Sequence, residues 1–297
     1  MRVLITGWFS FLHGEATAGD VGSAATVAAA LRGAGLACDV AWSPAFRPDG
    51  LRLEDAAAEH YSHLLFVCGP AHGGQVRALH ERYARCRRIA AGVSVVDPDD
   101  PAVRGFHRVI ARDRPGAAAM PDLAHAAPRG GAVPVVGVTA APEQPEYGVR
   151  SGHEAVHRRL AAWLTARDCA RVPLDTRLDR HDWRHCATLP QFDALVRRVD
   201  LVVTTRLHGL VLALRNGVPA LAVDPVAGGA KVRSQGRAWE WPVAVVPRAG
   251  EAPPRERLDE LWRWCRSPAA RERLDLLRRP LDGGGPVVAE LLRDLRR

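Results

Sequence analysis

Two side chains suited to anion binding and proton transfer stand two residues apart at the end of an apolar run. Arg206 and His208 follow the β-rich segment 201–205 and precede a helical pattern that stops at 216–217. In parallel α/β sheets, ligands bind at the carboxyl ends of strands, where helix N-termini attract anions. The pair therefore predicts an anion site with an acid or base built into it. Taken alone, it fits a structural ion pair or a solvated edge equally well.

A single lysine extends this cationic site. Lys231 follows the apolar run 220–223 and a glycine-rich loop, and it is the one lysine among 41 Lys plus Arg residues. In so arginine-rich a chain, a retained lysine indicates a role for a compact, strongly hydrated ammonium, although chance survival is the alternative. Both segments follow neighbouring strands of one predicted sheet. We therefore expect Arg206, His208 and Lys231 to converge on one pocket.

These residues resemble the polysaccharide pyruvyltransferase family. The shared features are Asp200, TTRLHG at 204–209, Asn-Gly-Val-Pro at 216–219, and a lysine that follows an acidic residue, Asp224…Lys231. The resemblance implies an α/β fold of two Rossmann-like domains in a GT-B-like arrangement, with a cleft between them. It also implies transfer of the enolpyruvyl group of phosphoenolpyruvate to two hydroxyls of a sugar or glycan acceptor, which forms a pyruvate ketal without a further cofactor.

The resemblance gives the predicted donor-site residues their roles. Arg206 and Lys231 would hold the phosphate or carboxylate of phosphoenolpyruvate, and the helix that begins near Gly209 would add its dipole. His208 would be the general acid. The family commonly carries an arginine after the first strand of the second domain, where this chain has Thr-Ala-Ala. Arg150 is the candidate replacement.

The acceptor is assigned to the N-terminal half. Asp20, in a Gly-Asp pair between the first predicted strand and helix, would bind or deprotonate the acceptor; Glu15 and His13 are less favoured alternatives. The Arg112-Asp113 pair also resembles the family. We interpret it as structural, because exposed charges at loop ends usually belong to the scaffold.

The chain of 297 residues is long enough for two domains. Its first half alternates predicted strands and helices, which indicates a parallel sheet with right-handed crossovers. Linker composition at 126–131 precedes a new apolar strand at 133–138. We therefore predict an N-terminal domain over 1–130 and a C-terminal domain over 131–297, with the acceptor side in the first and the donor site in the second.

One motif points to different chemistry. His153, Glu154 and His157 form an HExxH pattern, in which two histidines one helical turn apart bind zinc and the glutamate acts as a base. A third ligand is poorly supplied by the nearby sequence, and the segment lies where a crossover helix is needed. We therefore predict no metal site there.

Net charge and composition limit the class of partner. The net charge of +8 favours anionic partners, but no lysine-rich tract or RNP-like aromatic pattern indicates nucleic-acid binding. A GT-B glycosyltransferase that uses a nucleotide sugar is the main alternative. A non-catalytic anion- or nucleic-acid-binding protein is a weaker one, because it leaves the grouped cationic residues unexplained.

Cysteine spacing and hydropathy predict a cytoplasmic location. The six cysteines lie far apart without a C-x-x-C pair, which is typical of buried thiols in a reducing compartment. The sequence begins in a predicted strand without signal-peptide features, and no apolar run approaches the ~18 residues of a membrane span. Attachment to the inner membrane face would be peripheral. The acceptor's identity, the ketal stereochemistry and homo-oligomer formation stay open.

Overall fold

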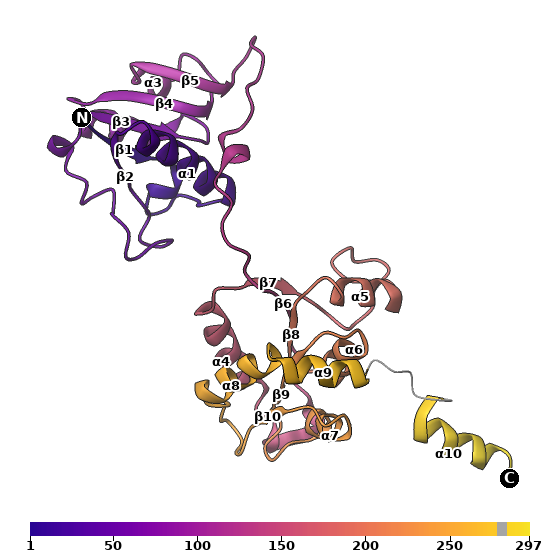
Figure 1. Ribbon diagram of the computed structural model, residues 1–297. Coiled ribbons are helices and arrows are strands. Elements are labelled where there is room, and N and C mark those ends of the chain that lie inside the picture. Colours follow the sequence, from indigo (N-terminus) through magenta and orange to yellow (C-terminus); the bar gives the residue numbers. More distant parts are fainter. Residues whose placement is uncertain (278–283) are drawn as a thin grey trace. The chain divides into compact units, whose positions relative to one another are not determined.

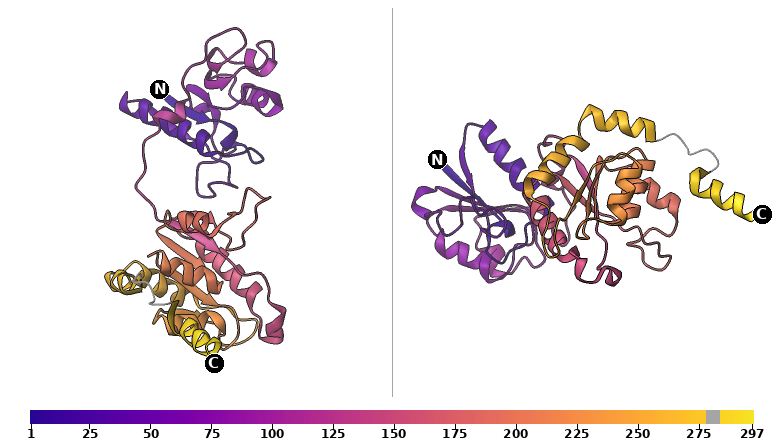
Figure 2. Two further views of the ribbon diagram at one scale, coloured as in Figure 1. Left: turned by 90° about the vertical axis from the view of Figure 1, so that its right-hand side faces the viewer. Right: turned by 90° about the horizontal axis from the view of Figure 1, so that it is seen from below.

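A computed structural model describes residues 1–277 and 284–297, which form two compact units (Figure 1). The N-terminal unit is Met1–Gly131 and the C-terminal unit is Ala132–Arg297. Each contains a five-stranded sheet in which every strand pairing is parallel. Helices lie against both faces of each sheet (Figure 2). The prediction of two Rossmann-like α/β domains is confirmed, whereas the cleft between them stays a prediction.

The N-terminal unit alternates strands and helices along its length. Its strands are β1 (Arg2–Thr6), β2 (Ala37–Val40), β3 (His63–Val67), β4 (Arg87–Ser94) and β5 (Arg108–Asp113). Its helices are α1 (Ala18–Gly33), α2 (Gly73–Arg82) and α3 (Pro101–Arg104), with short 3-10 turns η1 (Trp8–Ser10), η2 (Ala58–His60) and η3 (Leu123–Ala126).

The C-terminal unit repeats this alternation and adds helices at its end. Its strands are β6 (Val135–Thr139), β7 (Ala170–Pro173), β8 (Leu201–Thr204), β9 (Ala220–Asp224) and β10 (Val243–Val245). Its helices are η4 (Pro145–Arg150), α4 (His153–Thr165), α5 (Leu189–Val196), α6 (Leu207–Arg215), α7 (Lys231–Ala238), α8 (Arg255–Cys265), α9 (Pro268–Leu277) and α10 (Gly285–Leu295).

The two sheets share one strand order. The N-terminal order is β2-β1-β3-β4-β5, and the C-terminal order, read from its far edge, is β7-β6-β8-β9-β10. Each is the doubly wound order in which the chain switches direction between the first and third strands of the sheet. Ligands of such sheets bind outside the carboxyl ends of the strands at this switch point. The topology therefore marks two places for a ligand, one between β1 and β3 and one between β6 and β8.

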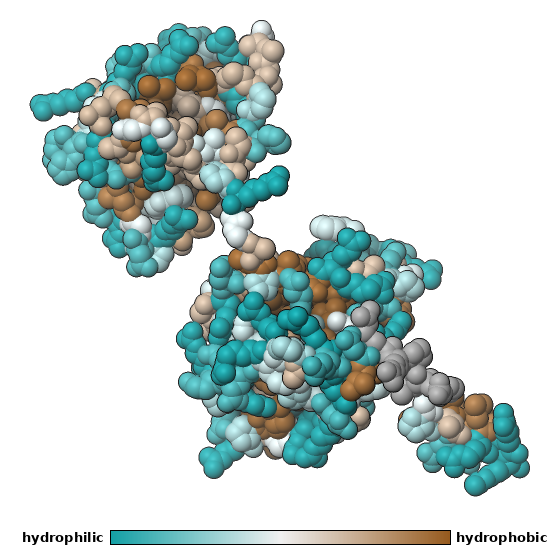
Figure 3. Space-filling view, in the orientation of Figure 1, coloured by the Kyte–Doolittle hydropathy of each residue, from teal (hydrophilic) through white to brown (hydrophobic). Residues whose placement is uncertain are grey.

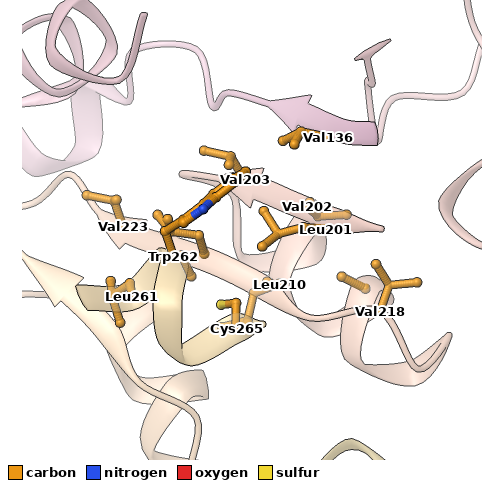
Figure 4. Close-up of a cluster of buried hydrophobic side chains, with 14 of the residues drawn as sticks. Val136, Leu201, Val202, Val203, Leu210, Val218, Val223, Leu261, Trp262 and Cys265 are labelled. Atoms are coloured by element: carbon orange, nitrogen blue, oxygen red, sulfur yellow. The ribbon is translucent and has the colours of Figure 1, made fainter. Parts of the chain in front are cut away.

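The central strands of the C-terminal sheet carry no outward polar face. All four residues of β8 and all five of β9 are buried, as expected for parallel strands covered on both faces. Figure 4 shows side chains of this core, with Val203, Leu210 and Trp262 drawn from a strand, α6 and α8 respectively. This packing fixes the carboxyl ends of β8 and β9, at the edge of the sheet where the topology places a ligand.

The surface shown in Figure 3 is largely hydrophilic, with scattered apolar patches. Helix α10 has an exposed apolar side, which comprises Val287, Val288, Leu291, Leu292 and Leu295. Over residues 1–277 and 284–297, no helix combines the length and the apolar character needed to cross a bilayer.

Candidate functional site

The switch point of the C-terminal sheet holds a pocket of about 270 Å³. It is lined by residues that follow β6, β7, β8 and β9, namely Ala141, Pro142, Gln144, Thr176, Arg206, Leu207, His208 and Lys231. Three of the residues predicted from sequence, Arg206, His208 and Lys231, therefore lie on one pocket. Across the described parts of the chain, no residue that lines it is acidic.

Helix α6 points its N-terminus at this pocket. Thr204 ends β8, and its Oγ1 accepts a hydrogen bond of 2.9 Å from the backbone N–H of Arg206, which is the N-cap. The N–H groups of Leu207, His208 and Gly209 belong to the first turn, where a helix offers no carbonyl partner. These donors and the helix dipole favour an anion at this place.

Gly209 allows this helix to approach the strands closely. A Cβ atom on Gly209 would lie 2.2 Å from Thr204 Oγ1 and 2.7 Å from Thr139 Cγ2. Any larger residue would push the first turn of α6 away from the ends of β8 and β6. Gly209 lies beside the pocket without lining it, so its contribution is to set the distance between helix and sheet.

Arg206 is anchored by two neighbouring strand ends. Its Nε donates to the carbonyl of Ala140 at 3.0 Å, and its Nη1 donates to Thr176 Oγ1 at 2.6 Å. Nη1 also lies 3.5 Å from Asp175 Oδ1, and the arginine side chain is 16% exposed. The structural ion pair considered from sequence is therefore present. It holds the guanidinium in place at the pocket wall.

His208 and Lys231 are the more exposed basic side chains of the pocket. His208 is exposed at the second position of α6. Lys231 begins α7, and its side chain is 39% exposed. Its Nζ lies 3.9 Å from Glu146 Oε1 and 5.7 Å from the ring centre of Tyr147. This ion pair is long and exposed, so it costs little to exchange for a bound anion.

Asp224 builds the loop that presents Lys231. This carboxylate is fully buried at the end of β9 and accepts hydrogen bonds from the backbone N–H groups of Val226, Ala230 and Arg233. The last two bonds cap the start of α7. Asp224, the acidic residue of the sequence motif, thus binds backbone N–H groups of the loop and of α7. These hydrogen bonds fix the backbone at the start of α7 and thereby the position of Lys231.

Arg150 is not among the residues that line the pocket. Its Nε and Nη2 donate to the carbonyl of Ala227, and Nη2 also donates to the carbonyl of Gly229. The backbone N–H of Ala227 in turn donates to the carbonyl of Arg150. The guanidinium predicted to replace the family arginine therefore braces the glycine-rich loop, because the loop carbonyls take up its donors.

The HExxH histidines lie in the first turns of α4, the crossover helix between β6 and β7. His153 is 2% exposed and its Nδ1 lies 2.8 Å from Ser151 Oγ; His157 Nε2 lies 3.1 Å from Thr205 Oγ1. The two rings are 6.1 Å apart at their centroids. In the part of the chain that the structure describes, no cluster of three His, Cys, Asp or Glu residues is placed to hold a metal ion.

This histidine pair makes stability depend on pH. Burial lowers the pKa of both imidazoles, and the neighbouring His153 lowers that of His157 further. In the unfolded chain, both histidines take up protons near pH 6.5. The unfolded state therefore binds more protons below that pH, and the free energy of unfolding falls as the pH drops.

We expect urea unfolding to show a smaller pH dependence in a variant with both His153→Gln and His157→Gln. The comparison is between about pH 7.5 and about pH 5.5, since the loss lies below the unfolded pKa. Because other groups also titrate in this range, the wild type serves as the reference. An equal fall in both proteins would contradict the assignment of this pH dependence to the pair.

The switch point of the N-terminal sheet holds a second pocket, of about 480 Å³. It is lined by residues that follow β1 and β3, by the start of α1, and by one residue in β5 and one after it: Trp8, Glu15, Thr17, Gly19, Asp20, Cys68, Gly69, Pro70, His72, Arg112 and Asp122. The rings of Trp8 and His72 lie 5.6 Å apart at their centroids. The wall therefore combines aromatic surface with carboxylates.

Two of the three residues predicted for the acceptor line this second pocket. Asp20 is 9% exposed and forms a capping box with Thr17, in which its Oδ2 accepts from the Thr17 hydroxyl at 2.7 Å and from the Thr17 backbone N–H at 3.2 Å. Glu15 is an exposed lining residue. His13 is exposed and is not part of the lining.

Arg112 also lines this pocket, which the sequence did not indicate. It donates to Asp113 Oδ2, Asp122 Oδ2 and Ser94 Oγ at 2.7, 2.5 and 2.7 Å. The hydrogen bonds that Arg112 donates to Asp113 and Asp122 raise its pKa. Arg112 thus has the structural pairing expected from the sequence, and in addition it presents a fixed positive charge to the pocket.

Comparison with known proteins gives a family for one part of the chain. A family model matches residues 169–225, which run from just before β7 to just past β9 and include Arg206 and His208. The family is polysaccharide pyruvyl transferase. The resemblance inferred from sequence is confirmed over this segment, which ends before Lys231. None of the curated proteins compared gives a significant match.

Several solved structures are similar to the chain at low sequence identity. The glycotransferase of kitacinnamycin is 12% identical with a TM-score of 0.36, over 99% of this chain and 98% of that one. The spinosyn rhamnosyltransferase SpnG complexed with its aglycone is 14% identical with a TM-score of 0.36, over the full length of both chains. The E. coli heptosyltransferase WaaC with ADP is 12% identical with a TM-score of 0.28, over 89% of this chain and all of that one. These values are too low to bear on activity.

Proposed function

We propose that this protein is a transferase that moves the pyruvyl group of phosphoenolpyruvate to hydroxyls of a sugar or glycan and forms a pyruvate ketal. The supporting observation is that Arg206, His208 and Lys231 line one small pocket at the N-termini of α6 and α7. Phosphate and carboxylate groups suit a guanidinium, an ammonium and free helix N–H groups.

In the proposed reaction, protonated His208 gives its proton to the methylene carbon of phosphoenolpyruvate. The neighbouring carbon becomes oxocarbenium-like and is attacked by one acceptor hydroxyl, whose proton passes to a base. The bond from this carbon to the phosphate oxygen then breaks, and the phosphate takes the proton from that base and leaves as hydrogen phosphate. A second acceptor hydroxyl attacks the same carbon and closes the ketal, and its proton is taken up by His208. The imidazole thereby returns to the protonated state in which it started.

The acceptor is assigned to the pocket of the N-terminal unit. Its aromatic surface, Trp8 with His72, suits the apolar face of a sugar ring, and its carboxylates suit sugar hydroxyls. Asp20 is the proposed base or acceptor ligand. Because its Oδ2 is already bonded to Thr17, Oδ1 is the oxygen through which it would act.

A thermal-shift comparison tests the donor assignment. Phosphoenolpyruvate should stabilise the protein by about 2.7 kcal/mol at a concentration 100 times its Kd, whereas UDP- and GDP-sugars should give no comparable shift. Stabilisation by a nucleotide sugar alone would favour a glycosyltransferase. Stabilisation by short RNA or DNA alone would favour a nucleic-acid-binding protein.

A further inference from the structure

One peptide group at the switch point of the C-terminal sheet is held from both ends. It joins Ala140 to Ala141, directly after β6. Its carbonyl accepts from Arg206 Nε at 3.0 Å, and its N–H donates to Thr205 Oγ1 at 2.8 Å. The two residues that hold it are consecutive in the chain, at the end of β8. Rotation of this peptide would therefore break both bonds together.

Thr205 has one further partner, and this partner is a histidine of the HExxH segment. Thr205 is 2% exposed, and its Oγ1 lies 3.1 Å from His157 Nε2. The N–H of Ala141 occupies one lone pair of the hydroxyl oxygen, and we assign the hydroxyl hydrogen to His157, with Nε2 as its acceptor. Burial lowers the pKa of His157 and so favours the neutral imidazole, and Nε2 is an acceptor in the tautomer that carries its proton on Nδ1.

We propose that His157 is a positioning residue for the anion pocket. It fixes the Thr205 hydroxyl, which fixes the peptide 140–141, and the carbonyl of that peptide orients the guanidinium of Arg206. The proposal rests on the proposed function in one respect, which is the identification of the bound anion as phosphoenolpyruvate. It gives a role to the histidine in the second turn of α4. The HExxH motif to which this histidine belongs lacks a third metal ligand among the described residues.

These hydrogen bonds form a relay from His157 through Thr205 and the peptide 140–141 to Arg206. The relay matters because the side chain of Arg206 cannot adjust freely. Its Nη1 is held by Thr176 at 2.6 Å, so the carbonyl of Ala140 decides the rotation of the guanidinium about that point. Ala141 and Arg206 both line the pocket. Loss of the Thr205 hydroxyl or of the His157 acceptor therefore changes the pocket wall and the anion contact at the same time.

The test compares isosteric and conservative substitutions by calorimetric titration with phosphoenolpyruvate and, separately, with inorganic phosphate. We expect Thr205→Val and His157→Phe each to weaken anion binding about tenfold, as for one lost hydrogen bond to a charged site. Thr205→Ser and His157→Gln, which keep a hydroxyl and a side-chain nitrogen or oxygen near Nε2, should bind within about threefold of wild type. The double variant Thr205→Val/His157→Phe should lose about as much as either single one, since both act in one chain of bonds.

His80→Phe is the matched control. His80 is another half-buried histidine whose pKa is lowered by burial, and its Nε2 contacts the carbonyl of Ala102 in the N-terminal unit. We expect this variant to bind both anions as wild type does. Equal weakening in His80→Phe would mean that the His157 effect is one of general stability, and the proposal would be wrong.

A measurement without ligand completes the test. In ¹⁵N NMR spectra at about pH 7.5, His157 should be the neutral tautomer with an unprotonated Nε2, and the Nε2 signal should move in Thr205→Val. Unchanged phosphate binding in Thr205→Val, or a protonated Nε2 that ignores this substitution, would overturn the relay. Binding of phosphate but not of phosphoenolpyruvate to the wild type would instead contradict the proposed function, and the relay would be judged on phosphate.

Discussion

Replacing His208 by alanine should lower turnover about a hundredfold or more while leaving the Kd for phosphoenolpyruvate within about threefold of wild type. A positioned general acid contributes about a hundredfold to ten-thousandfold to rate. It transfers a proton in the reaction and does not supply the charge that binds the donor. The anion contacts come from Arg206, Lys231 and the α6 N-terminus, which this substitution leaves in place. Phosphate release in the presence of acceptor measures turnover, and calorimetric titration measures binding.

Two companion variants make this result specific. His208→Gln keeps a hydrogen-bonding side chain but cannot carry the proton, so it should be as slow as His208→Ala. His181→Ala removes an exposed histidine from a loop of the same unit and should be as fast as wild type. Unchanged turnover at saturating donor in His208→Ala, with weaker binding, would make the imidazole a binding group. The acid would then be another residue.

Lys231→Ala should weaken binding of phosphoenolpyruvate about tenfold to a hundredfold. A charge-assisted contact to an anion is worth about 1.5–3 kcal/mol, and each 1.4 kcal/mol is a factor of ten in Kd. The ammonium stands at the first position of α7, where its contacts among the described residues are a 3.9 Å ion pair with Glu146 and a position over the Tyr147 ring. Little structure depends on this side chain, so the loss should appear in affinity and not in the free energy of unfolding.

The same helix supplies the control for Lys231. Arg237→Ala removes an equal charge from α7, at an exposed residue that does not line the donor pocket. It should leave the Kd nearly unchanged. Lys231→Arg should restore binding only in part, because a planar guanidinium does not present the compact charge of an ammonium. Equal losses in Lys231→Ala and Arg237→Ala would show that net charge alone attracts the donor.

The parts of the site that lie on one strand–helix unit were predictable from sequence. The apolar run before Arg206 is β8, the helical pattern after it is α6, and Asn216 is the C-cap. The meeting of Lys231 with His208 followed from the rule that parallel strands present their carboxyl ends at one edge. These inferences needed only local periodicity and topology.

The capping role of Asp20 also had a sequence signal. Thr17-Ala-Gly-Asp20 is a Thr-x-x-Asp pattern just before an alanine-rich helix, which is a capping box. The family resemblance assigns this aspartate to the acceptor, and the structure adds its role in the cap. Both roles use the same carboxylate, and the cap leaves only one of its oxygens for chemistry.

The anchoring of Arg206 could not be predicted in the same way. Thr176 lies 30 positions before it, and their contact depends on β6 lying between β7 and β8 in the sheet. The contacts of the Arg150 guanidinium depend on carbonyl groups of the glycine-rich loop. The directions of these carbonyls are set by the buried carboxylate of Asp224. Local patterns contain no information on such directions. The link from His157 to Thr205 is of the same kind.

A crystal structure with phosphoenolpyruvate bound tests the central claim most directly. The account predicts the donor in the 270 Å³ pocket of the C-terminal unit, with one of its anionic groups about 3 Å from Lys231 Nζ and from N–H groups of the first turn of α6. His208 should then lie within reach of the methylene carbon. Phosphoenolpyruvate bound elsewhere, or a nucleotide sugar in this pocket under the same conditions, would contradict the account.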